Sequence, residues 1–282
     1  MKTMVRTLLI LLLSLAFSSA AWGHIFDLKR QQETSLNLVL EDLAGVQTIF
    51  IGELHDRQAH HQAQLQLIRE LHQAGVILSI GLEMFRQDGQ DQLDQWIEGK
   101  IEEKKFAGIF EDHWSLWDQY REIFLYAREK AIPLVGLNIR RELVNQVARQ
   151  GFASLSPEQR AELPIAGCNV NPAYRDFIRR AYNGHGENSS EFEHFCEAQM
   201  LWDASMAKHL HEYLQRNPQR VVVVLAGNGH SWKHGIPEQL GLLGSFSHRV
   251  LLPETLGHTD LQTIGIEDAD YLLQGLDQGP LH

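Results

Sequence analysis

Residues 48–55 read Thr-Ile-Phe-Ile-Gly-Glu-Leu-His, and residues 221–230 read Val-Val-Val-Val-Leu-Ala-Gly-Asn-Gly-His. In both stretches an unbroken apolar run leads into a Gly-x-x-His turn. A strand that is buried on both faces of a parallel sheet has this composition. The carboxyl ends of parallel strands meet at one edge of a sheet, where ligands of open α/β folds collect. We therefore expect the two turns to face each other across a binding site.

The rest of the chain alternates apolar runs with helical stretches. Further apolar runs lie at residues 76–82, 132–137, 249–252 and, more weakly, 271–273, and amphipathic helices are predicted at 58–73 and 117–130. Short apolar strands separated by such helices are typical of βαβ crossovers. The sequence therefore predicts the α/β class, with a mostly parallel central sheet flanked by helices.

One connection, between the runs at 132–137 and 221–226, is far longer than a single crossover requires. Within it, Ser156-Pro157 is a typical N-cap followed by proline at the first helical position. Asn171-Pro172 is expected to open a second short helix, and a longer helix is expected at about 191–215. We interpret residues 142–190, approximately, as a small helical sub-domain inserted before the fourth strand.

The N-terminus has the pattern of a secretory signal peptide. Lys2 and Arg6 precede an apolar run at 8–17, and small residues follow up to Gly23. The apolar run is too short to span a membrane, and no cysteine follows it that could carry a lipid anchor. We expect residues 1–23 to be removed and residues 24–282 to form one exported domain, periplasmic or secreted, without a transmembrane span.

Charge and cysteine content narrow the class further. The formal net charge of −11 disfavours nucleic acid and anionic lipid as partners. Cys168 and Cys196 are the two cysteines of the chain. A disulfide is the expected state in an oxidising compartment, and two reduced thiols are the alternative.

Polar residues follow each of the predicted strands that lead to the expected edge. They are Glu53 and His55, then Glu83, then Asn138 with Arg140 and Arg141, and finally Asn228 and His230. Imidazole and carboxylate groups suit a divalent Zn, Mn, Fe or Co ion, so the candidate metal ligands are Glu53, His55, Glu83 and His230.

The same groups also suit hydrolysis. His55, Glu83 and His230 are then the candidate catalytic residues. Asn138, Arg141 and Asn228 are expected to complete that pocket, with an arginine holding an anion. Each residue taken singly also has a structural interpretation, as a helix cap or a hydrogen-bonded core group.

The ordered set of motifs resembles a known family. The two Gly-x-x-His turns, together with Gly81-Leu82-Glu83-Met84, residues 133–138 and residues 195–203, resemble the ChaN-like haem-binding uptake proteins of the Tiki/TraB/erythromycin-esterase superfamily. The resemblance spans about residues 48–254. It implies a parallel sheet with a helical sub-domain, haem as the cofactor, tyrosine ligation of the iron, and a homodimer that encloses two stacked haems.

The superfamily also implies a competing function. Other branches are metal-dependent proteases or esterases that use the Gly-x-x-His histidines and the intervening glutamate. One departure concerns location, because ChaN-like proteins are typically lipoproteins and this chain lacks the lipobox cysteine.

A candidate haem site lies on the predicted long helix. His209 and Tyr213 are four residues apart and share a face, and Met206 lies one turn earlier. A tyrosine that ligates ferric iron must ionise, and a nearby imidazole stabilises the phenolate. We expect Tyr213 to ligate the haem iron, with Tyr182 and His185 as the second choice. The same stripe of residues also suits ordinary packing of an amphipathic helix on the sheet.

The sequence thus predicts an exported haem-binding protein of haem or iron uptake. The alternative is a metal-dependent peptidase or esterase that acts at the strand ends.

Overall fold

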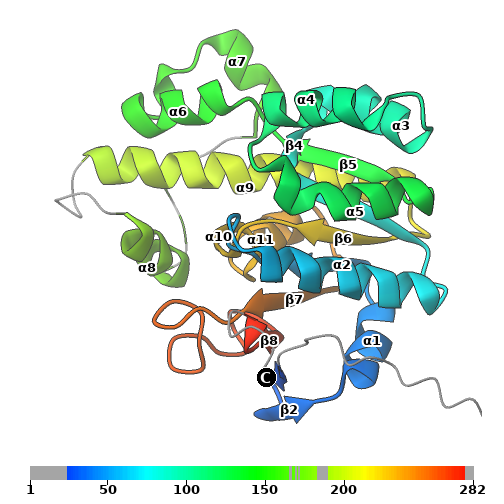
Figure 1. Ribbon diagram of the computed structural model, residues 1–282. Helices are drawn as coiled ribbons and strands as arrows, with labels where there is room; N and C mark the ends of the chain where they lie inside the picture. Colours follow the sequence, from blue (N-terminus) through cyan, green and yellow to red (C-terminus); the bar gives the residue numbers. More distant parts are fainter. Residues whose placement is uncertain (1–23, 165–166, 169, 171, 183–189, 277–282) are drawn as a thin grey trace, which may run out of the picture.

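The computed structural model describes residues 24–164, 167–168, 170, 172–182 and 190–276. Within these residues the strands form one eight-stranded sheet in the order β2-β1-β8-β7-β3-β6-β4-β5 (Figure 1). The predicted fold class is confirmed. The predicted signal peptide lies outside the described residues.

The six parallel strands, β3 to β8, overlap the apolar runs of the sequence. The bounds are β1 Ile25–Asp27, β2 Gln32–Thr34, β3 Thr48–Ile51, β4 Leu78–Arg86, β5 Leu134–Asn138, β6 Val221–Leu225, β7 His248–Pro253 and β8 Tyr271–Leu273. The neighbouring pairs from β8 to β5 are parallel, whereas β1 is antiparallel to both β2 and β8. Strand β6, which is the fourth parallel strand in chain order, follows the long helical connection. Strands β1 and β2 are three residues each and were not predicted.

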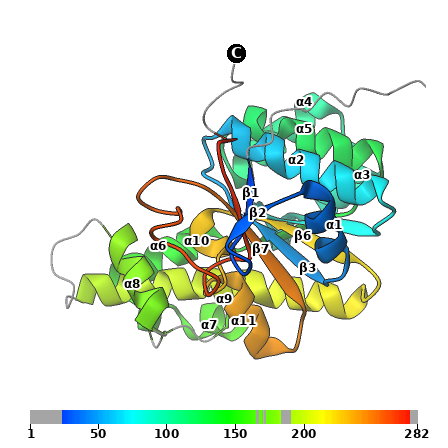
Figure 2. The same cartoon turned by 90° about the horizontal axis from the view of Figure 1, so that it is seen from below.

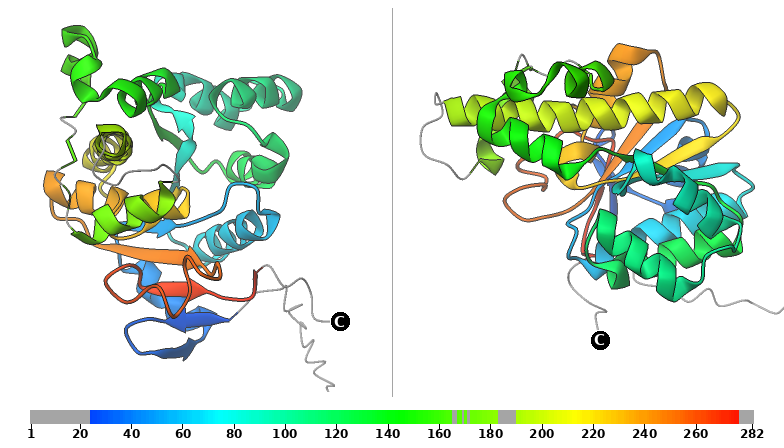
Figure 3. Two further views of the ribbon diagram at one scale, coloured as in Figure 1. Left: turned by 90° about the vertical axis from the view of Figure 1, so that its left-hand side faces the viewer. Right: turned by 90° about the horizontal axis from the view of Figure 1, so that it is seen from above.

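Helices cover both faces of the sheet. They are α1 Leu36–Ala44, α2 Gln58–Gln73, α3 Gln90–Ile97, α4 Glu103–His113, α5 Trp117–Glu129, α6 Arg141–Gln150, α7 Pro157–Glu162, α8 Pro172–Ala181, α9 Ser190–Arg216, α10 Asn228–Ser231 and α11 Ile236–Leu243, with 3-10 turns at Gln87–Gly89 and Phe152–Ser154. Helices α1 to α5 bury one core cluster against the sheet, and α8, α9 and α11 bury a second cluster against the opposite face. The two layers are visible in Figures 2 and 3.

Local sequence signals explain several helix ends. Gly75 follows α2 with φ +85°, a conformation that favours glycine. The Ser156 side chain accepts a hydrogen bond from the Gln159 backbone N–H, and the Gln159 side chain accepts one from the Ser156 N–H. This capping box begins α7 at the proline that the sequence marks.

The connection before β6 holds α6, α7, α8 and the long helix α9. Cys168 and Cys196 form a disulfide with a Cα–Cα distance of 5.4 Å, as expected from the sequence. This bond joins the segment that precedes α8 to the first half of α9. Across the described ranges no helix is both long and apolar enough to cross a membrane.

Candidate functional site

The two Gly-x-x-His turns do face each other, and each glycine makes room for the other turn. A Cβ atom on Gly52 would lie 2.3 Å from Oδ1 of Asn228, and one on Gly227 would lie 3.1 Å from the His55 ring. Any larger residue at position 52 therefore requires the Asn228 side chain, and that of Leu252 at 2.7 Å, to shift. The repeated glycine of the motif has a steric cause in the contact between β3 and β6.

His55 is held by a buried carboxylate. Its Nδ1 donates to Oε1 of Glu53 at 2.7 Å, and the Tyr120 hydroxyl donates to the same oxygen. The other Glu53 oxygen accepts from Gln64 Nε2 at 2.8 Å and lies 3.4 Å from Nδ1 of His61. This clamp fixes the tautomer of His55 and turns its Nε2 away from Glu53.

The same contacts also shift the pKa values of Glu53 and His55. Burial alone would raise the pKa of Glu53, but the hydrogen bonds from His55 and His61 outweigh it and hold that pKa well below its usual value. Burial opposes charging of His55, but the carboxylates of Glu83 and Glu53 raise its pKa. Glu53 is therefore an ionised anchor rather than an acid.

His230 is held in a similar way, by a buried carboxylate and a tyrosine from the other side of the sheet. Its Nδ1 donates to Oδ1 of Asp203 at 2.6 Å, and the Tyr174 hydroxyl donates to Oδ2 of Asp203 at 2.5 Å. Both oxygens of Asp203 accept, which is the pattern of an ionised carboxylate even though burial raises its pKa. Burial disfavours charged His230, but Glu83 and Asp203 raise its pKa to about 9.

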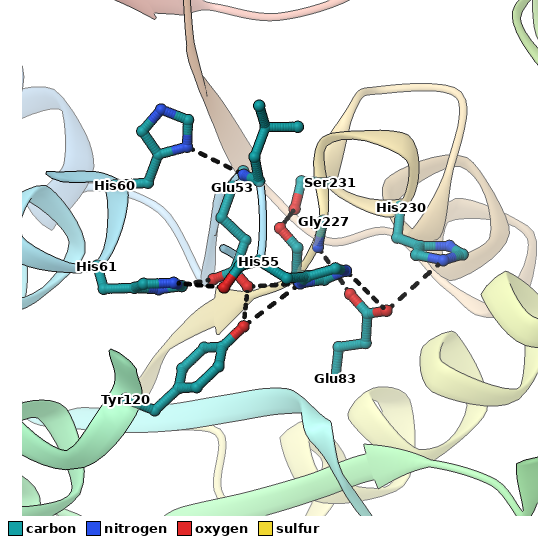
Figure 4. Close-up of polar contacts among 12 residues, drawn as sticks. Glu53, His55, His60, His61, Glu83, Tyr120, Gly227, His230 and Ser231 are labelled. Atoms are coloured by element: carbon teal, nitrogen blue, oxygen red, sulfur yellow. Dashed lines mark hydrogen bonds and ion pairs between the residues drawn. The ribbon is translucent and has the colours of Figure 1, made fainter. Parts of the chain in front are cut away.

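Glu83 lies between the two imidazoles (Figure 4). Its Oε2 accepts the Gly227 backbone N–H at 2.7 Å, whereas its buried Oε1 has no hydrogen-bond partner in the protein. That Oε1 is 3.9 Å from His55 Nε2 and 3.7 Å from His230 Nε2. These distances are too long for direct hydrogen bonds. The three groups therefore converge without bonding one another, as groups that bind or act on a further atom do.

The four predicted metal ligands do not all face one point. Glu53, His55, Glu83 and His230 come together, but Glu53 faces Nδ1 of His55, on the far side of the ring from Glu83. In the described part of the chain, no group of three or more His, Cys, Asp or Glu side chains is arranged to hold a metal ion.

The three other residues predicted to complete the pocket differ in where they lie. Asn138 supports the site, because its Nδ2 donates to the Glu83 carbonyl at 2.7 Å and its Oδ1 accepts from Trp202 Nε1 at 2.5 Å. Asn228 lines the pocket, and its Oδ1 is buried without a hydrogen-bond partner. Arg141 is exposed at the start of α6 and is not among the residues that line the pocket.

A cavity of about 780 Å³ opens in front of these groups. Its apolar wall is made by Leu54, Leu116, Ile178 and Phe195. Polar groups at the same cavity include His55, His230, His258, Asn228, Thr255 and Thr259. A cavity of this size with an apolar wall and a few convergent polar groups is typical of a site for a cofactor or a small molecule.

The predicted haem face of α9 lies elsewhere. The Tyr213 hydroxyl shares a hydrogen bond of 2.7 Å with Ser79 Oγ, near the amino end of β4. Met206 is fully buried in the second core cluster, and His209 Nδ1 is 2.6 Å from the Leu137 carbonyl oxygen. The structure does not bring these three side chains to the strand-end pocket.

The second-choice tyrosine is closer to that pocket. The Tyr182 ring packs against Phe192 and Phe195, with ring centroids 5.6 and 5.3 Å apart. Phe195 is part of the pocket wall. His185, which was paired with Tyr182 in the sequence, lies outside the described residues.

Comparison with known proteins agrees with this architecture. The family model described as "Haem-binding uptake, Tiki superfamily, ChaN" matches residues 39–240. The chain belongs to this family. Residues 39–240 include both Gly-x-x-His turns, Glu83, the whole of α9 and strands β3 to β6, so the ChaN-like match covers the residues around Glu83 and the middle of the sheet.

Solved structures share the fold. A structure of ChaN from Campylobacter jejuni, described as showing cofacial heme binding, has a TM-score of 0.69 at 19% identity over 90% of this chain and 96% of that one. An erythromycin esterase mutant, EreC, in its open conformation has a TM-score of 0.50 at 15% identity over 83% of this chain and 76% of that one.

One curated relative is Protein RETICULATA-RELATED 5, chloroplastic, from Arabidopsis thaliana, which is 23% identical over 150 residues. The alignment covers 50% of this chain and about a fifth of that protein.

Proposed function

We propose that this ChaN-like protein binds haem in the strand-end pocket and serves haem or iron uptake outside the cytoplasm. The observation that carries the proposal is the pocket itself. Its volume of about 780 Å³ and its apolar wall suit a porphyrin, and its imidazoles suit iron. Family membership supports the same ligand.

Two tyrosines are candidates for the iron ligand. Tyr182 is our first choice, because its ring packs on Phe195 of the pocket wall. Tyr213, with His209 and Met206, is the competing site. Ligation by Tyr213 requires its bond to Ser79 to break, and fully buried Met206 can reach iron only if α9 moves off the sheet.

Export and dimerisation belong to the same proposal. The Cys168–Cys196 disulfide is typical of an oxidising compartment. The signal-peptide pattern of residues 1–23 supports a periplasmic or secreted location. We propose a homodimer formed in the presence of haem, which sedimentation with and without hemin can test.

Hemin titration into residues 24–282 tests the proposal. We expect a saturable shift of the Soret band in the wild-type protein. The Tyr182→Phe variant is expected to change the position of the bound Soret band, with Tyr213→Phe as the matched control that leaves it unchanged. A change in Tyr213→Phe alone moves the site to α9, and no saturable shift in the wild-type protein refutes haem binding.

A metal-dependent hydrolase is the second candidate, and the partnerless Oε1 of Glu83 between two imidazoles favours it. In this candidate, Nε2 of His55, Oε1 of Glu83 and Nε2 of His230 would hold the metal ion, which would supply an activated water for hydrolysis. An exposed ester or peptide bond is the matching substrate class.

Metal analysis of untagged protein and a panel of chromogenic esters test this candidate. Near-stoichiometric metal or turnover that is lost in His55→Gln and kept in His211→Gln supports it, since His211 lies outside the pocket. Metal-free protein without turnover rules it out.

A further inference from the structure

The residue before helix α5 has an unusual backbone. Leu116 has φ +71° and ψ +39°, in the left-handed region. Glycine, asparagine and aspartate adopt this conformation readily, whereas a leucine does so at a cost in free energy. The local backbone therefore does not explain why leucine is present.

The helix start does not explain leucine either. Leu116 is the N-cap residue of α5, a position that favours Ser, Thr, Asp, Asn or Gly. Its side chain cannot cap the helix, and Oε1 of Glu111 accepts the Trp117 backbone N–H at 2.9 Å instead. Asparagine or glycine would suit position 116 better on both local grounds.

Burial in the core is excluded as well. Leu116 is 40% exposed, although leucine is among the residues most often buried. Its neighbours, in contrast, are anchored. Trp117 is buried in the first core cluster, and the Trp114 ring meets the His55 ring edge-on with centroids 5.0 Å apart. The turn is thus fixed on both sides of the exposed leucine.

The position of Leu116 in the pocket does explain why a leucine is present. Leu116 lines the strand-end pocket. The aliphatic and aromatic side chains of Ile178 and Phe195, which line the same pocket, come from α8 and α9 on the other face of the sheet. Leu116 is the wall residue supplied by the α4–α5 connection.

We propose that Leu116 is a ligand-contacting residue, held in a strained conformation so that its side chain packs against the flat apolar face of a bound porphyrin. Strain that persists at one residue of a fixed turn is typical of a binding site. The porphyrin as ligand rests on the function proposed above, whereas the role of Leu116 is a separate claim.

Two variants separate ligand contact from a structural role. Leu116→Asn keeps the size of the side chain and removes its apolar character, and Leu116→Gly removes the side chain. Both are expected to raise the melting temperature of the ligand-free protein, because they relieve the backbone. Both are expected to weaken binding of hemin and of metal-free protoporphyrin IX by roughly tenfold, since apolar contact is lost.

The chain offers two matched controls. Ala131→Gly relieves a left-handed residue, φ +51°, that is exposed and does not line the pocket. Leu242→Asn removes a leucine that is 76% exposed on α11. Neither control is expected to change porphyrin affinity.

The outcomes are distinguishable. A stability gain together with weaker porphyrin binding in both Leu116 variants supports the proposal. Unchanged porphyrin affinity in variants of a protein that binds hemin refutes the role of Leu116 and leaves the proposed function intact. A lower melting temperature in Leu116→Asn assigns the residue to structure and also refutes the role. Failure of the wild-type protein to bind either porphyrin refutes the proposed function and, with it, this contact.

Discussion

Replacing Asp203 by asparagine should shift the titration of His230 and the stability of the whole domain. Asp203 is fully buried, and its Oδ1 is 2.6 Å from Nδ1 of His230. Asparagine keeps the shape of the side chain and removes the charge. The pKa of His230, raised to about 9 by Glu83 and Asp203 together, should therefore fall toward its ordinary value.

The magnitude follows from linkage. A rise from 6.5 to about 9 corresponds to about 3 kcal/mol of stabilisation of the charged imidazole. Glu83 and Asp203 share this effect, so removal of Asp203 should cost about 1–2 kcal/mol at pH 7. Because the pKa of His230 is raised on folding, its contribution is complete below pH 6.5. It is lost as the pH rises through about 9.

Denaturant unfolding between pH 6 and 10, together with NMR titration of the His230 ring, measures both effects. The wild-type protein should lose stability over this range, and Asp203→Asn should show a smaller slope and a lower His230 pKa. Asp176→Asn is the control, since Asp176 is exposed on α8 and bonded to Arg179 rather than to the site. Equal slopes and equal His230 pKa values in the wild-type protein and Asp203→Asn would refute the reasoning.

Three further perturbations test the architecture. Gly52→Ala places a methyl group 2.3 Å from Asn228 Oδ1, so we expect a loss of about 1–3 kcal/mol in the free energy of unfolding, and an unchanged denaturation midpoint would contradict the steric account. Reduction of Cys168–Cys196, or replacement of both by serine, should cost about 3–4 kcal/mol in the chain-entropy account, measured by calorimetry, and an unshifted transition counts against the bond. Asn138→Ala removes three side-chain hydrogen bonds, of which the one to the Glu83 carbonyl is buried, and should cost about 1–3 kcal/mol by denaturant unfolding, whereas a neutral effect would show that Asn138 does not tie the site together.

The strand ends could be predicted from the sequence because their signal is local. An apolar run followed by Gly-x-x-His is visible in either motif alone, and parallel pairing then places His55 and His230 at one edge. The steric reason for the glycines is different in kind. It depends on contact between two turns that are far apart in the chain, so it appears only in the structure.

The residues that hold the histidines were missed, because each acts through a tertiary contact. Asp203 and Tyr120 lie on helices and reach the site from opposite faces of the sheet. One signal was present for Asp203, which stands next to Trp202 and near Met206 in a largely apolar stretch of a predicted helix. An acid at a buried position of an amphipathic helix indicates a buried partner.

The predicted haem site on α9 shows a different problem: the sequence pattern is visible, but it has two interpretations. The spacing of His209 and Tyr213 correctly indicates a shared face, but periodicity cannot distinguish a ligand-binding face from one that packs on a sheet. The hydrogen bond between Tyr213 and Ser79 belongs to the second kind of contact. Strands β1 and β2 escaped prediction because they are short and contain polar residues, whereas the equally short β8 is an apolar run.

The central claim is that porphyrin binds in the strand-end pocket, and paramagnetic broadening of imidazole NMR signals by ferric hemin tests it most directly. Gallium protoporphyrin serves as the diamagnetic reference. We predict the largest broadening at His55, His230 and His258, which line the pocket, and little at His72, which bonds Tyr126 on the α2–α5 layer. Broadening that is largest at His209, with the pocket histidines unaffected, would contradict the account and place the haem on α9.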